Sequence, residues 1–104
     1  MTTTENYVPK LKRLLISTAA DAVLITGVAG KTVSVHGLLL QSVGGTVSLD
    51  DESGGVFGPF ILTAAPMNLP LSQLPYFQAT DGDALTIQLS ATDLNTGVLF
   101  YTQE

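Results

Sequence analysis

LTIQLS, residues 85–90, is the stretch that decides the fold class of this chain. Its apolar and polar residues alternate without exception, and successive side chains of a β-strand point to opposite faces of the sheet. Leu85, Ile87 and Leu89 are therefore expected on one face, and the polar residues between them on the other. The stretch predicts a β-strand with one face in a hydrophobic core and one face in water.

The same alternation occurs twice more upstream, in TVSVH at residues 32–36 and in TVSLD at residues 46–50. Gly44 and Gly45 stand just before the second of these segments, and paired glycines are a common connection between antiparallel strands. We therefore expect residues 32–36 and 46–50 to be two strands that pair with each other as a hairpin.

Further strand segments are rich in Val, Ile, Leu, Thr and Phe and are separated by Gly and Pro. They lie at residues 11–17, 22–26, 56–63 and 97–101. The last of them, GVLFY, is apolar on both faces, which is typical of a strand that closes the core or an interface.

Prolines restrict two regions of the predicted sheet. Pro59 interrupts the segment 56–63, and because proline lacks an N–H to donate, it belongs at a sheet edge or a bulge. Residues 65–77 contain three prolines, which exclude a helix and predict an extended excursion with short strand pieces.

The chain therefore has about eight strands at roughly ten-residue spacing, a pattern typical of antiparallel sandwiches and barrels. We expect an all-β fold, an antiparallel β-sandwich of the jelly-roll type. Its 104 residues suit one domain, which we place at residues 11–104. Residues 1–10 are expected to be a flexible N-terminal arm.

The composition favours a protein that assembles with others. Charged residues make up 12% of the chain and hydrophobic residues 45%, whereas about 25% of the residues in a soluble domain are charged. We expect neighbouring subunits to cover part of the surface, with a homotrimer as the expected oligomer. The net charge of −5 opposes nucleic-acid binding, and no apolar run approaches the roughly 20 residues of a membrane helix.

The residues required for catalysis are scarce. The chain has one histidine, His36, and no cysteine, so a nucleophile activated by histidine would have to use His36. Nothing around His36 resembles a nucleophile elbow, and we expect a surface or interface histidine. The acidic clusters 50–52 and 81–83 are expected to be solvated turns rather than a calcium site. We predict no enzyme, no catalytic residue, no metal and no cofactor.

Two groups of residues are candidates for binding a partner. Lys10, Lys12 and Arg13 supply three of the four basic residues in the chain and suit an acidic neighbour, although an ordinary basic strand after a frayed terminus is the alternative. Tyr76 and Phe77 are adjacent aromatic residues of the kind that anchors protein interfaces, and ordinary core packing is the alternative for both.

The order of several segments resembles that of small virion structural proteins of bacteriophages and prophages. The AGKTVSV segment at 29–35, GPFILTAA at 58–65, FQATDGDALTIQLSA at 77–91 and GVLFY at 97–101 carry this similarity. The resemblance spans residues 22–103, and the matching pieces consist of common strand and turn residues. The Asp50-Asp51-Glu52 turn and the proline-rich stretch 66–75 depart from the family pattern.

The resemblance implies a β-sandwich or jelly roll that self-associates on a phage particle. The expected function is that of a head decoration (cement) protein, made in the host cytoplasm, which binds the major capsid protein at junctions between capsid subunits. A tail-fibre or receptor-binding component of the virion is the alternative. Either way, the expected partners are copies of the chain itself and other virion proteins.

Overall fold

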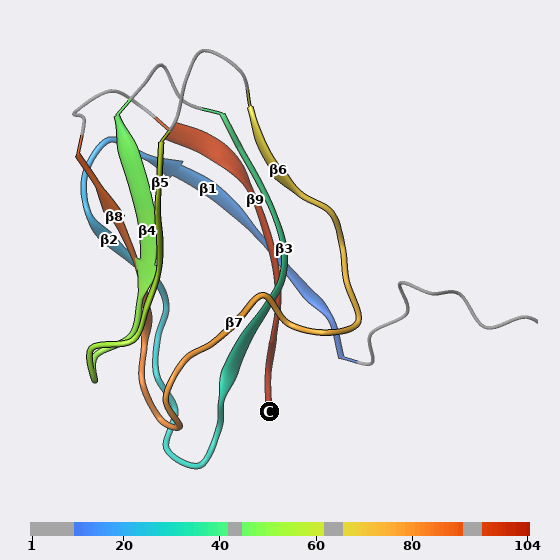
Figure 1. The fold of residues 1–104 in the computed structure, drawn as a ribbon. Coiled ribbons are helices and arrows are strands. Elements are labelled where there is room, and N and C mark those ends of the chain that lie inside the picture. Colours follow the sequence, from blue (N-terminus) through green and yellow to red (C-terminus); the bar gives the residue numbers. More distant parts are fainter. Residues whose placement is uncertain (1–9, 42–44, 62–65, 91–94) are drawn as a thin grey trace, which may run out of the picture.

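The computed structural model describes residues 10–41, 45–61, 66–90 and 95–104, and these residues form a sandwich of two β-sheets (Figure 1). Nine strands and no helix occur in these ranges. Every strand pair is antiparallel. The predicted all-β antiparallel sandwich is confirmed.

Each expected segment contains a strand, but β3 and β9 extend beyond the predicted 32–36 and 97–101, and residues 62–63 of the predicted 56–63 lie outside the described residues. They are β1 (Lys12–Thr18), β2 (Ala22–Ile25), β3 (Val33–Gln41), β4 (Thr46–Asp50), β5 (Val56–Ile61), β6 (Met67–Leu69), β7 (Phe77–Gln78), β8 (Leu85–Leu89) and β9 (Asn95–Gln103).

Each sheet combines strands that are far apart in the sequence. Sheet A has the order β1-β9-β3-β6, and β7 also pairs with β3; sheet B has the order β2-β8-β4-β5. The pairing is nested: β4 pairs with β5, β3 with β6 and β7, β2 with β8, and β1 with β9. The first and last strands therefore lie side by side in sheet A (Figure 1).

One hydrophobic core fills the space between the sheets. Leu85 and Ile87 are completely buried, and the half-buried Leu89 packs against the same core. Of the three polar residues of this stretch, Gln88 and Ser90 are exposed and Thr86 is half-buried. The predicted division of residues 85–90 into a core face and a wet face is confirmed. Burial of a large aliphatic side chain contributes about 1.5–3 kcal/mol, so this row is a main source of stability.

The predicted hairpin between residues 32–36 and 46–50 is wrong. These segments belong to β3 and β4, which lie in opposite sheets. Strand β3 already has β9 on one side and β6 and β7 on the other, so it has no free edge for β4. Both strands instead present their apolar residues to the same core from opposite sides. Gly44 lies outside the described residues.

The predictions made from the prolines are confirmed. Pro59 lies in β5, an edge strand of sheet B that pairs only with β4. Phe60 pairs with Val47 and Phe57 with Leu49, so Gly58 and Pro59 both lie opposite the single residue between those partners, which is a bulge. Residues 66–77 contain only the short strand β6 and the start of β7.

Candidate functional site

A row of apolar side chains crosses the outer face of sheet A, the face that points away from the core. Leu15 of β1 pairs with Val98 of β9, and Val98 pairs with Leu39 of β3. Leu15 is 75% exposed and Leu39 is 43% exposed, while Val98 is half-buried. Since neighbouring strands lie about 4.8 Å apart, the three side chains form one continuous surface.

Phe100 extends this surface toward the next row of the sheet. It pairs with Arg13 on one side and Gly37 on the other, and a Cβ atom on Gly37 would lie 3.2 Å from the ring carbon Cδ2. The ring therefore lies over Gly37 on the outer face. We call Leu15, Leu39, Val98 and Phe100 the apolar patch of sheet A.

Polar residues border the apolar patch. Arg13 lies beside Phe100, and the row beyond Leu15 and Val98 consists of Ser17, Thr96 and Gln41. No acidic residue belongs to the described strands of sheet A. An apolar centre with a polar rim is the composition expected of an interaction surface.

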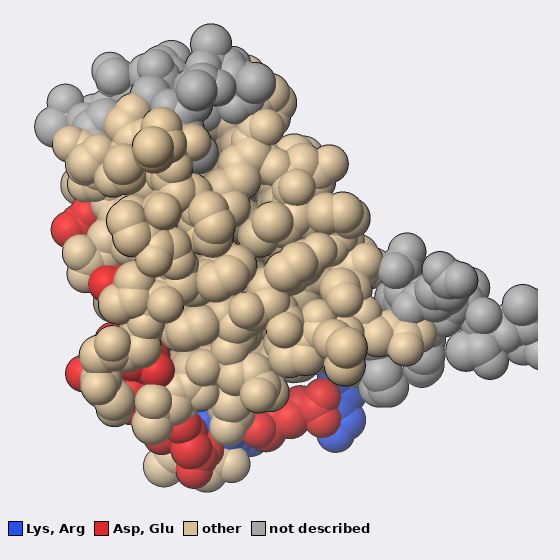
Figure 2. Space-filling model, viewed as in Figure 1, with Lys and Arg blue, Asp and Glu red and all other residues tan. Residues whose placement is uncertain are grey.

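The outer face of sheet B is polar along its two central strands. Ser48 pairs with Gln88, and Asp50 pairs with Thr86. The Ser48 hydroxyl donates a hydrogen bond to Asp50 Oδ1 at 3.0 Å. Acidic side chains are visible on this side of the molecule in Figure 2. This face suits contact with water.

Lys10 and Lys12 meet a third lysine in the folded chain. Together with Lys31 they line a groove of about 570 Å³, which the C-terminal residue Glu104 also borders. Arg13 does not belong to this groove. It alternates with Lys12 along β1 and shares the outer face of sheet A with Leu15. The three predicted cations are therefore divided between two surfaces, and sequence reasoning missed Lys31 because the groove forms only on folding.

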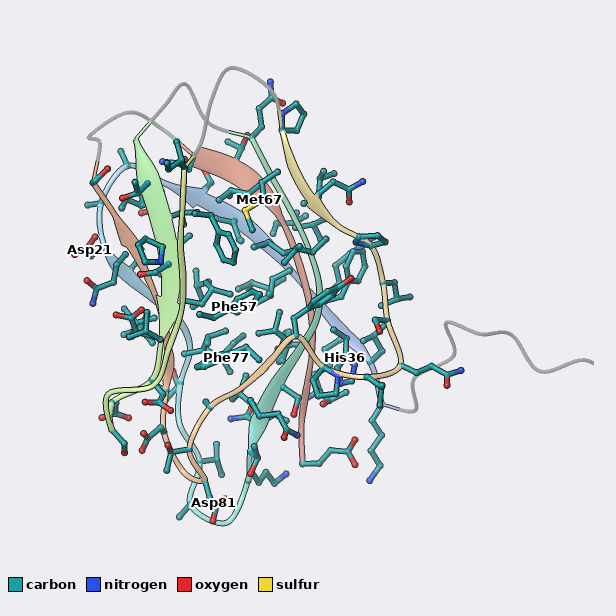
Figure 3. All side chains as sticks on the ribbon, viewed as in Figure 1. Asp21, His36, Phe57, Met67, Phe77 and Asp81 are labelled. Atoms are coloured by element: carbon teal, nitrogen blue, oxygen red, sulfur yellow. The ribbon has the colours of Figure 1, made fainter. Side chains whose placement is uncertain are left out.

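Tyr76 and Phe77 both take part in contacts within the chain. The Phe77 ring stacks on Phe57 with centroids 5.9 Å apart and packs against the core. Figure 3 shows these two rings in the space between β5 and β7. The Tyr76 hydroxyl donates a hydrogen bond to the Pro70 carbonyl oxygen at 2.6 Å. Their role in binding a partner stays a prediction.

His36 is buried within the chain, so of the two expected positions the surface one is wrong and the interface one stays a prediction. It is 6% exposed, and its Nδ1 atom lies 2.9 Å from the Ser72 carbonyl oxygen. Because a carbonyl only accepts hydrogen bonds, Nδ1 carries the proton. Nε2 then accepts from the Thr102 hydroxyl at 3.4 Å. Both ring nitrogens therefore have hydrogen-bond partners within the chain.

A bulge in β3 explains where the side chains around His36 point. Val35 pairs with Tyr101 and Gly37 with Phe100, two adjacent residues, so His36 is an extra residue in β3. The alternation changes phase at this point. His36 faces outward, toward a polar pocket of about 310 Å³, whereas Leu38 is buried in the core. The bulge therefore places His36 and Leu38 on opposite faces of β3.

The two acidic clusters converge at one end of the sandwich, where Asp51 is the central acceptor. Its Oδ2 accepts hydrogen bonds from the Thr80 backbone N–H and hydroxyl at 2.8 and 2.9 Å. Its Oδ1 accepts from the backbone N–H groups of Ser53 and Gly55. These bonds join the turn after β4 to the loop after β7. Asp51 therefore ties the turn after β4 to the loop that connects β7 of sheet A with β8 of sheet B.

Neighbouring carboxylates repeat this arrangement. The Ser53 hydroxyl donates to Asp83 Oδ2 at 2.7 Å, and the Ala84 N–H donates to Glu52 Oε1 at 2.8 Å. Among the residues that the structure describes, no group of three or more acidic or histidine side chains is placed to hold a metal ion. The acidic oxygens accept bonds that hold two loops together.

The hydrogen bonds to Asp51 change its acidity. Partial burial acts to raise the pKa of the Asp51 carboxyl, but the hydrogen bonds from Thr80, Gly55 and Ser53 outweigh burial and hold the pKa below its ordinary value of 3.8. Asp51 is therefore a charged structural residue at neutral pH.

Sequence reasoning missed most of the apolar patch of sheet A. Consecutive apolar residues were a usable signal: in Leu14-Leu15 and in Leu38-Leu39-Leu40, adjacent side chains on a strand must point to opposite faces. One residue of each run therefore had to be on the outside. Which strands lie beside one another was not visible in the sequence, so the separate residues did not form a patch.

Within the described ranges, no helix is long and apolar enough to cross a membrane. Comparisons of this chain with known protein families, curated proteins and solved structures find no match.

Proposed function

We propose that this chain is a non-enzymatic structural protein of a bacteriophage virion, a head decoration protein that binds at junctions between capsid subunits. The apolar patch of sheet A is the observation that carries the proposal. Leu15 and Leu39 leave much of their surface in water, and covering apolar surface contributes about 25 cal/mol per Å². Contact of this patch with a capsid subunit would bury it and add adhesion across the junction.

The basic groove supplies the second contact in this proposal. Lys10, Lys12 and Lys31 gather in a chain whose net charge is −5, and complementary charges mainly set encounter rate and register. An acidic capsid segment is the partner that this groove fits. Salt would weaken the contact, because exposed charges are screened over about 8–10 Å at physiological ionic strength.

The jelly roll belongs to the same proposal. Two four-stranded layers joined by two Greek keys define that fold. The nested pairing of β1 with β9, β2 with β8, β3 with β6 and β4 with β5 supports it, because the pairs alternate between the two sheets.

Mixing the purified protein with undecorated and fully decorated phage heads tests the proposal. We expect binding to the undecorated heads alone, saturating at a copy number set by the capsid lattice, measured by co-sedimentation and densitometry. Binding to isolated tails or host cells without binding to heads would contradict the decoration role and favour a tail-fibre or adsorption component.

A pair of variants links the binding to the patch. Leu39→Ser together with Val98→Thr removes apolar surface from the outer face of sheet A, and we expect head binding to fall at least about tenfold, equivalent to 1.4 kcal/mol. Gln88→Ser changes the polar outer face of sheet B and serves as the control. Equal losses in both proteins would contradict docking through the patch.

A further inference from the structure

The four outer edges of the two sheets differ in how well they resist pairing with another strand. Edge strands commonly avoid such pairing by being short or by carrying proline or a bulge. In sheet A, β6 has three residues and lies between Pro66 and Pro70. In sheet B, β5 contains Pro59 and a bulge, and β2 has four residues with a shift in its register.

β1 has none of these protections at its centre. Its seven residues pair with β9 in one unbroken register, and it contains neither proline nor glycine. Within the part of the chain that the structure describes, β9 is the one strand with which it pairs. Alternate N–H and C=O groups along its other side are therefore available to a further strand.

We propose that β1 pairs antiparallel with β1 of a second copy of this chain, around a twofold axis at Leu15. The product is a dimer in which two five-stranded sheets join into one continuous sheet. An isologous contact of this kind uses the same surface on both copies. The inference rests on the proposed function in one respect: it names the contact through which the proposed virion protein associates with itself. It replaces the expected homotrimer with a homodimer.

The residues of β1 suit pairing with themselves in this register. Leu15 is the middle residue of Lys12–Thr18, so the axis at Leu15 brings all seven residues of each strand into pairs. Leu15 then lies opposite Leu15 of the second copy. Registers centred on Leu14 or Ile16 leave residues at the strand ends unpaired and place Leu15 opposite Arg13 or Ser17.

The charges of β1 are compatible with this contact. Both of its charged residues, Lys12 and Arg13, lie at its beginning, and its end carries Ser17 and Thr18. In the antiparallel dimer each cation lies opposite a hydroxyl residue, so like charges do not face each other. A parallel arrangement would place Lys12 and Arg13 opposite the same cations of the second copy, which is unfavourable.

The contact also explains the exposure of Leu15. At 75% exposure it is among the most exposed large apolar residues of the described chain, and the twofold axis places another leucine against it. The apolar row then continues across the axis, from Leu39 and Val98 of one copy to those of the other. The dimer would offer the capsid an apolar surface twice as long as that of the monomer.

Sedimentation velocity on the isolated protein at micromolar concentration tests the proposal. We expect a dimer with twice the monomer mass of 10.9 kDa. Leu15→Lys and Leu15→Glu place like charges opposite each other, and we expect each variant to weaken the dimer at least about tenfold. An equimolar mixture of the two variants pairs opposite charges at the axis and is expected to restore the dimer.

Two controls keep the test specific. Leu39→Lys changes the same outer face two strands from the edge, and Val23→Lys changes the edge strand β2 of sheet B. Both are expected to remain dimers, and circular dichroism is expected to show wild-type folding in all four variants. A wild-type monomer or trimer, a dimer that Leu15→Lys leaves intact, or a mixture that fails to recover would overturn the proposal.

The test is independent of the phage particle. A dimer that behaves as expected but binds no head would contradict the proposed function alone. A protein that binds heads while its isolated form is a monomer would contradict the β1 contact alone.

Discussion

The outer faces of sheets A and B come from the same kind of strand and yet suit different surroundings. In sheet B the central strands present Ser48, Asp50, Thr86 and Gln88. The exposed apolar residues of this sheet, Val23, Val56 and Ile61, lie apart on its two edge strands. In sheet A the exposed Leu15 continues into Val98 and Leu39. Isolated apolar residues are normal on a protein surface, whereas a continuous group marks a contact. The difference supports the proposal that sheet A, rather than sheet B, is the contact face.

The largest expected effect comes from the core that both faces share. Ile87→Asp places a carboxylate where the side chain is completely buried, and we expect a loss of about 4 kcal/mol or more, enough to prevent folding. Gln88→Asp, the adjacent residue on the outer face of sheet B, is expected to change stability by less than about 0.5 kcal/mol. Urea unfolding measures both, and a folded Ile87→Asp protein would show that the faces are assigned wrongly.

Loss of the Asp51 charge is expected to have the next largest effect. Asp51→Asn keeps the side-chain shape but removes the charge that accepts four hydrogen bonds, and bonds to charged groups contribute about 1.5–3 kcal/mol. We expect a loss of that size at pH 7. Asp83→Asn removes charge from an acceptor of one such bond, and its smaller expected loss serves as the control.

The lowered pKa of Asp51 predicts that the stability of the protein depends on pH. Because the pKa of Asp51 in the folded protein is lower than its ordinary value of 3.8, its contribution is present above that value and is lost as the pH falls through the folded pKa. The stability advantage of the wild type over Asp51→Asn is therefore expected to shrink below about pH 4. Thermal unfolding from pH 7 to pH 2.5 measures it, and a constant difference would contradict the role given to the charge.

Making the outer face of sheet B apolar tests the difference between the two outer faces most directly. Thr86→Val with Gln88→Leu gives the central strand of sheet B an apolar outer row beside Val23. We expect the fold to persist, with a stability change below about 1 kcal/mol, and concentration-dependent association to appear in light scattering. Absence of new association would mean that the apolar character of a face does not by itself cause contact.

The smallest effect on stability is expected from the cations. Lys10→Ser, Lys12→Ser and Lys31→Ser together remove the three positive charges that line the basic groove. Exposed charges contribute less than about 1 kcal/mol each to stability. We expect weaker attachment to heads and a smaller response of attachment to salt. Gln88→Ser, on the polar outer face of sheet B, is the control. Wild-type attachment of the triple variant at low and high salt would exclude the groove from docking.

Several features of the molecule follow from the sequence alone because they depend on local geometry. Alternation at residues 85–90 predicted the strand and its buried face, since side chains on a strand point to opposite sides wherever the strand lies. Pro59 predicted an edge or bulge, because a missing N–H cannot be supplied by folding. The sandwich followed from repeating these local rules along the chain.

Other features were decided only by the tertiary structure, because they depend on which strands become neighbours. Residues 32–36 and 46–50 alternate in the same way, yet they lie in opposite sheets, where both fill one core. The bulge at His36 reversed the faces of β3 within one strand. Leu15, Val98 and Leu39 are far apart in the sequence and form one surface only because β1, β9 and β3 pair, and that surface distinguishes the two outer faces.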